Sequence, residues 1–523
     1  MSEARADTVR RPQPCVPSFC ITVGGLCVSR QRDEITTRRV HRVHAVLAAT
    51  PPVLALVLML SRSFRPESLA AAILVLSIVV AVTAFGARLS DFTGEYVEIS
   101  PTLLEVVLIL FGGTLLNKQL TAVGAYSLVA DWIQRFSADR SRSVLLICLG
   151  ITPFAESVTG FGIGIVVAIP LLLGLGFTRF QAAALGLLGL VLVPWGALAP
   201  GTLVASELTG VGFDRLGMDS ALLTLPVLLL TGLAALLIGC GRRIALRRLP
   251  ELLFVAGVLW AGVLAAQAVA GTSLAGALGS LAGIAAAVAL IWFRDGSGPR
   301  PSRAIGVVLS PYGLLLAGLL GSRLLLAVLG AQRGLVPTVV SSPAFWLLMT
   351  CAAAPWLLGG KARGSEPVVA AVRQWWPVAL ATALFLLVGA TLTASGMSAE
   401  LARTAARLGR PYVALAPWIG AMGGFLTGST TGANAMFAAS QAGAAHSLGY
   451  SVPTLVALHN VAGSLLTMAS VPRVVFALEL TSAGSSAAGS KPGRSSELHR
   501  LLLTILGVDA AVLLVFSVIA LVA

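Results

Sequence analysis

The chain has 523 residues, of which 57% are hydrophobic and only 11% are charged, and its formal net charge is +14. Soluble globular domains carry about 25% charged residues, so this composition excludes a soluble fold. It predicts an all-α polytopic membrane protein with roughly 12 to 14 transmembrane helices. The arginines and lysines lie largely in short loops between apolar stretches, which is typical of membrane proteins and argues against a nucleic-acid partner.

The basic run TTRRVHRVH, residues 36–44, leads into the first apolar stretch. Arginines directly before a membrane span indicate the cytoplasmic side. We therefore expect residues 1–43 to form a disordered, basic, cytoplasmic tail and residues 44–521 to form the transmembrane domain. The six cysteines show no CxxC spacing, so we expect free thiols and neither a metal site nor a cofactor.

Several segments interrupt the apolar stretches. Residues 120–136 and 398–409 are amphipathic, and we expect them to lie at the membrane interface. The stretch VPWGALAPGT, residues 193–202, contains two prolines that should break its helix. The loop GRRIALRRLP, residues 241–250, carries four arginines and is predicted to be cytoplasmic.

The stretch FAESVTGFGIG, residues 154–164, places a carboxylate in the middle of an apolar region. A charged side chain at the centre of a bilayer costs about 2.5–3.5 kcal/mol or more unless it faces a cavity or binds a proton. Glu156 is therefore our candidate for proton coupling. The alternative is a neutral acid that only satisfies the broken backbone beside it.

Hydroxyls and glycines surround this acid, and we predict that they bind substrate. Glycines allow a ligand to approach the backbone closely, although close helix packing would also explain them. The candidates in this first break are Ser157, Thr159, Gly160, Gly162 and Gly164.

A second polar stretch, TGSTTGAN at residues 427–434, interrupts the apolar sequence near the C-terminus. Its uncharged donors suit a substrate carboxylate and hydroxyl, whereas the alternative is hydroxyls that bond back to their own helix. The substrate-binding candidates here are Thr427, Ser429, Thr430, Thr431 and Asn434.

The helix predicted after the second break contains LVALHNVAG, with His459 and Asn460. Histidine within a span is a second candidate for proton coupling, and a satisfied core histidine is the alternative. Asn460 joins the substrate-binding candidates. Arg473 follows close by and is a weaker candidate for anion binding.

The two breaks lie in corresponding positions of an internal repeat, about residues 102–240 and 375–478. A shift of about 273 residues pairs Gly176 and Phe177 with Gly449 and Tyr450, and it pairs Glu156 with Ser429. Paired helix breaks in two halves of a membrane protein indicate the binding site of a transporter, commonly built from inverted repeats. Arginines precede both breaks, so charge counting does not establish the inversion.

At these residues the sequence resembles the L-lactate permease family, which includes glycolate permeases. The resemblance rests on PFAESVTGFGIGIVVAIPLLLGLGF (153–177), VPWGALAPGT (193–202), PWIGAMGGFLTGSTTGANAMF (417–437) and LHNVAGSLLTMASVP (458–472). Residues Ser157 and Val158 follow the acid where usual members carry glycine and small residues, so the chain looks like a divergent member.

The resemblance implies a secondary transporter of the ion transporter superfamily. It would carry a small 2-hydroxymonocarboxylate, L-lactate or glycolate, together with a proton across a bacterial inner membrane. The rivals are a sodium-coupled carrier of another organic or inorganic anion, a channel and a membrane enzyme. The chain has no P-loop, HExxH or GxSxG motif to favour an enzyme. The oligomeric state stays open, a homodimer included.

Overall fold

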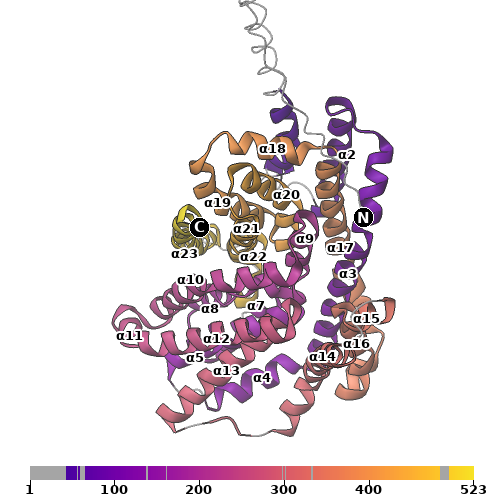
Figure 1. The fold of residues 1–523 in the computed structure, drawn as a ribbon. Helices are drawn as coiled ribbons and strands as arrows, with labels where there is room; N and C mark the ends of the chain where they lie inside the picture. Colours follow the sequence, from indigo (N-terminus) through magenta and orange to yellow (C-terminus); the bar gives the residue numbers. More distant parts are fainter. Residues whose placement is uncertain are drawn as a thin grey trace, which may run out of the picture.

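The structure is a computed structural model, and it describes residues 43–55, 57–58, 65–136, 139–160, 162–296, 298–300, 302–330, 334–482 and 494–522. This part of the chain is built from helices and their connections (Figure 1). The predicted all-α polytopic class is confirmed. The prediction of a disordered tail falls almost entirely outside the described residues.

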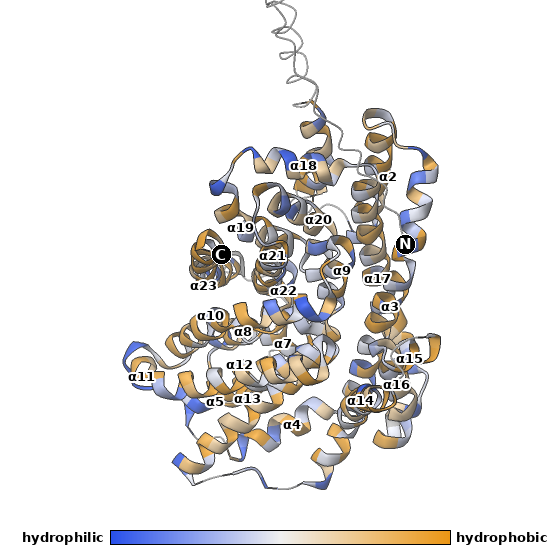
Figure 2. Ribbon diagram, in the orientation of Figure 1, coloured by the Kyte–Doolittle hydropathy of each residue, from blue (hydrophilic) through white to orange (hydrophobic). Residues whose placement is uncertain are grey.

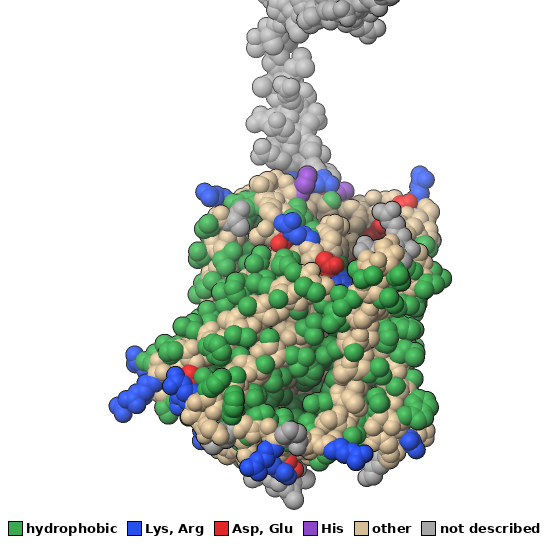
Figure 3. Space-filling model, turned by 60° about the horizontal axis from the view of Figure 1, so that its bottom comes forward, with side chains coloured by type: hydrophobic (Ala, Val, Ile, Leu, Met, Phe, Trp, Pro, Cys, Tyr) green, Lys and Arg blue, Asp and Glu red, His purple; other side chains and the backbone are tan. Residues whose placement is uncertain are grey.

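Ten helices among the described residues are long and apolar enough to cross a membrane. They are Pro66–Ala84, Leu89–Ala122, Arg140–Thr159, Phe213–Cys240, Leu249–Ala270, Thr272–Asp295, Arg303–Val328, Glu366–Ala394, Val452–Ser482 and Ser496–Val522. Many of the exposed residues of these helices are large and hydrophobic, and hydrophobic residues predominate along the helices in Figure 2. On the face drawn in Figure 3, Lys and Arg side chains gather toward two opposite ends with a hydrophobic zone between them. A multi-pass membrane protein requires this distribution.

Long helices form one side of the molecule. Helix α17 (Glu366–Ala394) packs against both α2 (Pro66–Ala84) and α3 (Leu89–Ala122), and the three run side by side in Figure 1. Helices α14 (Arg303–Val328), α15 (Leu335–Val340) and α16 (Pro343–Leu358) with the short η3 (Gly360–Arg363) lie at one end of this side. A separate apolar core joins α2, α3 and α17.

A series of short elements follows α3. It comprises α4 (Ala125–Gln134), α5 (Arg140–Leu146), η1 (Ile147–Ile151), α6 (Thr152–Thr159), α7 (Ile163–Gly174), α8 (Arg179–Leu188), η2 (Val193–Leu198), α9 (Pro200–Thr209) and the long α10 (Phe213–Cys240). The prolines at 194 and 200 stand at the start of η2 and of α9, so the predicted interruption is confirmed. Each proline lacks the N–H that a helix interior would need.

A similar series follows α17. It comprises α18 (Met397–Ala406), α19 (Arg410–Thr427), α20 (Thr430–Leu448), α21 (Val452–Leu466), η4 (Thr467–Ala469), α22 (Val471–Ser482) and the long α23 (Arg494–Val522). Glycines stand at corresponding helix starts and turns in the two series. Gly124 and Gly396 start the short helices α4 and α18 in the left-handed conformation, and Gly176 and Gly449 make the later turns at φ 78° and 74°.

Helices α11 (Arg242–Arg247), α12 (Leu249–Ala270) and α13 (Thr272–Asp295) connect the first series to α14. Helices α12 and α13 pack closely because small residues such as Gly262 and Gly279 face the partner helix. Helix α13 in turn packs on α6 and η2, and so it supports the first break from behind.

An ion-pair network closes the end of the molecule where α5 starts. The buried Arg142 pairs with Glu251 of α12, at 3.0 Å, and with Asp295 of α13. Arg248 joins Glu251 to Asp139, whose carboxylate also accepts hydrogen bonds from the first N–H groups of α5. Such a network compensates each buried charge and ties α5 to the α12–α13 hairpin.

The Asp139 cap generates a stability prediction. Burial alone would raise the pKa of Asp139, but hydrogen bonds from Ser141 and Arg142 and the charge of Arg248 lower it below its ordinary value. We expect Asp139→Ala to reduce the free energy of unfolding, measured by SDS titration from detergent micelles, by roughly 1–2 kcal/mol at pH 7. Because the pKa is lowered in the folded state, the loss should shrink as the pH falls below about 4.

The control for this variant is Asp219→Ala, which removes only the single exposed pair with Arg215. It should change the free energy by no more than about 0.5 kcal/mol. Equal effects of the two substitutions, or a loss from Asp139→Ala that does not depend on pH, would contradict the role of Asp139 as a charged cap.

Candidate functional site

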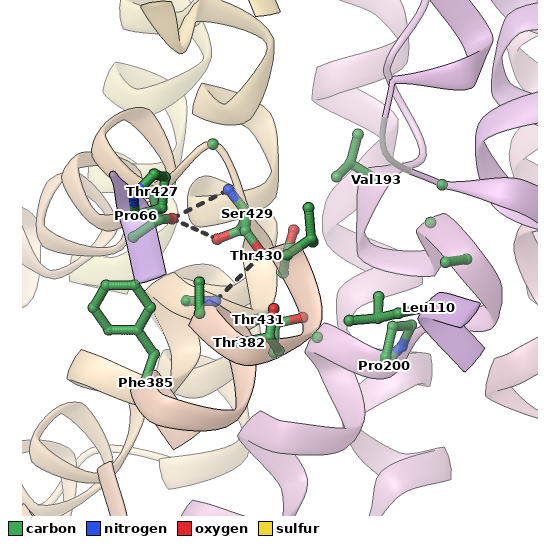
Figure 4. A pocket seen from close by; sticks show the side chains of 18 of the residues that line it. Pro66, Leu110, Val193, Pro200, Thr382, Phe385, Thr427, Ser429, Thr430 and Thr431 are labelled. Atoms are coloured by element: carbon green, nitrogen blue, oxygen red, sulfur yellow. Dashed lines mark hydrogen bonds between the residues drawn. The ribbon is translucent and has the colours of Figure 1, made fainter. Parts of the chain in front are cut away.

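A cavity of about 510 Å³ lies where the predicted breaks of the two series meet. Its polar side is formed by the end of α6, by η2 and the start of α9, by the turn between α19 and α20, and by the start of α22. Its apolar side is formed by α2, α3 and α17. In Figure 4, Thr427, Ser429 and Thr430 lie on one side of the space and Leu110, Val193 and Pro200 on the other.

The first break separates α6 from α7. Gly160 has φ 70° and ψ −164°, a conformation essentially restricted to glycine, and Gly162 starts α7 at φ 77°. The backbone therefore turns between the two helices, and Gly160 comes against Ala197 of η2: a Cβ on Gly160 would stand 2.6 Å from the Cβ of Ala197. The break is thus held by close contact between two interrupted segments.

The Glu156 carboxylate reaches across this break. Its Oε1 accepts a hydrogen bond from the N–H of Gly162 at 3.1 Å, and its Oε2 accepts one from the N–H of Gly164 at 3.3 Å. These donors belong to the start of α7, where the helix dipole favours a negative charge. Only 1% of Glu156 is exposed, but the residue lines the cavity.

Arg473 compensates the charge of Glu156 from the other series. Its Nη2 lies 3.5 Å from Glu156 Oε1, and both side chains are largely buried. Its Nη1 is buried without a hydrogen-bond partner among the described residues, and Arg473 lines the cavity. Arg473 is the third residue of α22, where the helix dipole disfavours a cation. This end of the cavity is therefore suited to an anion.

The second break leaves a helix start pointing at the cavity. Ser429 caps α20, its Oγ accepting from the N–H of Gly432 at 3.4 Å, and the Thr427 hydroxyl accepts from the N–H of Ser429 at 3.1 Å. The N–H groups of Thr430 and Thr431 donate to no other described part of the chain. Free N–H groups at a helix N-terminus form an anion-binding position.

A third interruption, η2, completes the polar side. Ala197, Leu198 and Ala199 follow one another with φ of 52°, 65° and 72°, a conformation that costs roughly 1–3 kcal/mol for a non-glycine residue. The chain then enters α9, where Gly201 packs so closely on α20 that a Cβ would stand 2.8 Å from the Cβ of Thr430. Strained backbone of this kind is concentrated at functional sites in proteins.

Six of the thirteen sequence-predicted site residues line the cavity. They are Glu156, Gly160, Thr427, Ser429, Thr430 and Thr431. The others are not among its described lining residues. Gly162 and Gly164 lie directly behind it and hold Glu156, while the Thr159 hydroxyl donates back to Ala155 within α6. Ser157 is buried against Gly276 of α13.

Asn434 and Asn460 form a buried polar network instead of lining the cavity. Asn434 donates to Gly201 O at 2.7 Å and to Asn460 Oδ1 at 2.9 Å, and Asn460 donates to Thr202 and Ser220 at 3.1 Å. These bonds tie α20 and α21 to α9 and α10. The two asparagines therefore fix the position of the second break relative to η2 and α9.

His459 is not among the described residues that line the cavity. It is fully buried on α21, where its backbone and its Nδ1 come against Gly420 of α19. A role for His459 in proton coupling stays a prediction.

Two features of the site could not be predicted from sequence patterns: the partner of Arg473 and the apolar wall. Arg473 was visible as an intramembrane cation, but no spacing indicated that its partner would be Glu156, 317 residues away. The apolar wall, with Leu69, Leu110 and Phe385, comes from helices that look like ordinary spans. Only the packing of α17 against α2 and α3 brings this wall to the polar breaks.

Comparison with known proteins agrees with the sequence resemblance. The family model described as L-lactate permease matches residues 44–297 and 338–516. The L-lactate permease of Escherichia coli K12 is 38% identical over 106 residues, 20% of this chain and 18% of that protein. The glycolate permease GlcA of the same organism is 27% identical over 175 residues, or 33% and 31% of the two chains.

A putative L-lactate permease of Haemophilus influenzae is 27% identical over 165 residues, and the match covers 30% of each chain. The chain thus aligns with less than a third of the length of each of these relatives.

The first break generates a prediction about two glycines. Gly160→Ala should prevent the protein from folding correctly around the cavity. A Cβ at this position would collide with Ala197, and the backbone conformation of Gly160 is not accessible to alanine. Gly162→Ala is the matched control: it also has a positive φ, but its Cβ would meet only the end of Ile165 at 3.6 Å. We expect Gly162→Ala to cost roughly 1–2 kcal/mol and to leave the protein folded. Thermal unfolding and size-exclusion profiles in detergent measure both, and equal behaviour would contradict the described break.

Proposed function

Because the chain belongs to the L-lactate permease family, we propose that it is a secondary transporter that carries a small monocarboxylate, of the L-lactate or glycolate type, together with a proton across a bacterial inner membrane. The observation that carries this proposal is the ion pair between Glu156 and Arg473 at the wall of the cavity. In the proposed mechanism Arg473 binds the substrate carboxylate and Glu156 takes up the proton.

The substrate carboxylate would bind between Arg473 and the start of α20. A guanidinium can hold a carboxylate through two parallel hydrogen bonds, and the Nη1 of Arg473 is buried without a hydrogen-bond partner in the described part of the chain. The free N–H groups of Thr430 and Thr431 supply further donors at a helix N-terminus that lines the cavity. No carboxylate of a described residue accepts from these groups, whereas N–H groups at the start of α7 already donate to Glu156.

The rest of the cavity suits a small molecule with one apolar end. Leu110 and Phe385 line the side formed by α3 and α17. The hydroxyls of Thr382 and Thr431 also line the cavity and form no hydrogen bond with another described residue, so they are available to a substrate hydroxyl. A 2-hydroxymonocarboxylate combines these three features: a carboxylate, a hydroxyl and, in lactate, a methyl group.

Charge balance explains why a proton would accompany the anion. The empty site holds one carboxylate and one guanidinium, so its net charge is zero. An anion that bound alone would leave an uncompensated negative charge in a buried region, which is costly. A proton on Glu156 removes that charge and frees Arg473 for the substrate. The loaded site is again neutral, so it can cross the membrane interior at less cost than a charged site.

We also propose that the two series of elements form a duplicated unit, about residues 102–240 and 375–478, whose relative movement gives alternating access. Both series contain a break that lines one cavity, and the arrangement matches that of transporters with discontinuous helices. The strained turn at Ala197–Ala199 sits between the two breaks and would absorb backbone changes during this movement. Whether the two units are inverted remains a prediction.

The coupling role of Glu156 is testable with Glu156→Gln. The glutamine keeps an oxygen for the N–H of Gly162 but cannot exchange a proton, so accumulation driven by a pH gradient should fall at least tenfold in proteoliposomes. Exchange of labelled for unlabelled lactate should continue, because Arg473 remains. Asp509→Asn is the matched control, since Asp509 is a second fully buried carboxyl outside the cavity lining. Full proton-driven uptake by Glu156→Gln would exclude the proposed coupling.

The same assay distinguishes the sodium-coupled alternative. Replacing sodium by choline should leave uptake unchanged, and a pH gradient alone should drive it. Uptake that requires sodium and ignores the pH gradient would overturn proton symport in favour of a sodium-coupled carrier.

The binding role of Arg473 is testable with a pair of variants. Arg473→Gln leaves Glu156 uncompensated and should destabilise the protein by roughly 3–5 kcal/mol. The double variant Glu156→Gln/Arg473→Gln removes both charges and should recover most of that stability without recovering lactate binding. Thermal unfolding and isothermal titration with L-lactate measure the two properties. Lactate binding of wild-type affinity by the double variant would contradict a binding role for Arg473.

A further inference from the structure

A second cavity, of about 560 Å³, lies at the junction of α5, α10 and α11, away from the residues that line the transport cavity. Three arginines line it, namely Arg140, Arg247 and Arg248, and one carboxylate, that of Asp139. The charged groups of its lining therefore carry an excess of positive charge. Arg140 and Arg247 take part neither in the proposed transport mechanism nor in the ion-pair network described above.

The single carboxylate of this cavity is already engaged. Asp139 accepts hydrogen bonds from the start of α5 and pairs with Arg248 at 2.8 Å. Arg248 is also held by Glu251 at 2.6 Å, so this arginine is a fixed part of the wall. The negative charge of Asp139 is thus neutralised within the protein and does not satisfy the other two arginines.

The remaining two arginines are available to an anion. Arg140 lies 4.0 Å over the Phe177 ring and donates to Gln181 at 3.1 Å and to Gly176 O at 3.4 Å. Its guanidinium is thus oriented without a carboxylate partner among the described residues. Arg247 is exposed and forms no ion pair or hydrogen bond with another described residue. The hydroxyl-bearing Ser141 lines the same cavity.

The cavity adjoins an apolar surface of the kind that faces lipid. Ile244 lines the cavity and is 46% exposed, and Leu237 and Leu246, which are near it in the sequence, are 39% and 51% exposed. Helix α11 joins two helices that are long enough to span the membrane, so this surface lies at the end of the hydrophobic zone. In Figure 3, Lys and Arg side chains protrude at the left edge beside hydrophobic side chains, where Figure 1 places α11.

We propose that this cavity binds the headgroup phosphate of an anionic phospholipid. Arg140 and Arg247 would hold the phosphate, and the acyl chains would lie along Leu237 and Ile244. Basic pockets between transmembrane helices bind anionic headgroups, and the adjoining exposed apolar residues favour a lipid over a soluble phosphate. The bound lipid would bridge α11 and Arg140, which begins the helix Arg140–Thr159 that carries Glu156. The site does not depend on the proposed transport activity.

The test uses the full-length protein in dodecyl maltoside and two variants of equal charge. Arg140→Gln/Arg247→Gln removes the two available arginines. Arg242→Gln/Arg243→Gln is the control, because it removes two exposed arginines of α11 that are not among the lining residues of the cavity. Native mass spectrometry during titration with phosphatidylglycerol measures the affinity of the first bound lipid. The pocket variant should bind about 30-fold more weakly than wild type, roughly fivefold for each arginine, and the control variant should bind within about twofold of wild type.

Lipid selectivity and a single-arginine variant provide two further measurements. Phosphatidylcholine should bind the wild-type protein at least tenfold more weakly than phosphatidylglycerol, and millimolar inorganic phosphate should not compete. Arg247→Gln alone, which removes no described contact, should weaken binding about fivefold without changing the melting temperature of the lipid-free protein. Equal weakening by the pocket and control variants, or competition by inorganic phosphate at the affinity of the lipid, would overturn the proposal.

Discussion

A buried carboxylate that spans a helix break is the interaction on which the rest of the site depends. Glu156 accepts hydrogen bonds from the N–H groups that start α7 and pairs with Arg473 from α22. Without the acid, α7 would begin with unsatisfied N–H groups, and the arginine would be an isolated buried cation. Each group compensates the charge of the other in an apolar surround, so the pair has no net charge.

Close backbone contacts hold this pair in place. Gly160 lies against Ala197, and Gly201 lies against Thr430, so the three interrupted segments touch one another where side chains would keep them apart. The network of Asn434 and Asn460 then ties the second break to α9 and α10. The cavity is consequently the place where three helix interruptions meet, while its opposite wall is formed by the continuous helices α2, α3 and α17.

Local chemistry explains how much of this was predictable. A carboxylate beside glycines and a run of hydroxyls stand out in an apolar sequence because hydrocarbon tolerates neither charges nor free backbone groups. Both breaks were therefore located correctly, and six of the predicted residues line the cavity. His459 and Asn460 carry the same local signal but are buried and are not among the described lining residues. Asn460 instead joins a buried hydrogen-bond network, because a polar residue can serve a network as readily as a ligand.

The sequence alone determined that the chain is a helical membrane protein, that it resembles the L-lactate permease family and that its helices break at two polar stretches, because composition and local backbone requirements can be read residue by residue. Only the tertiary structure decided which charges meet, and so it paired Glu156 with Arg473 and placed Leu110 and Phe385 opposite them. Such contacts join residues hundreds of positions apart. They depend on how whole helices pack, and no periodicity or motif in the chain records that packing.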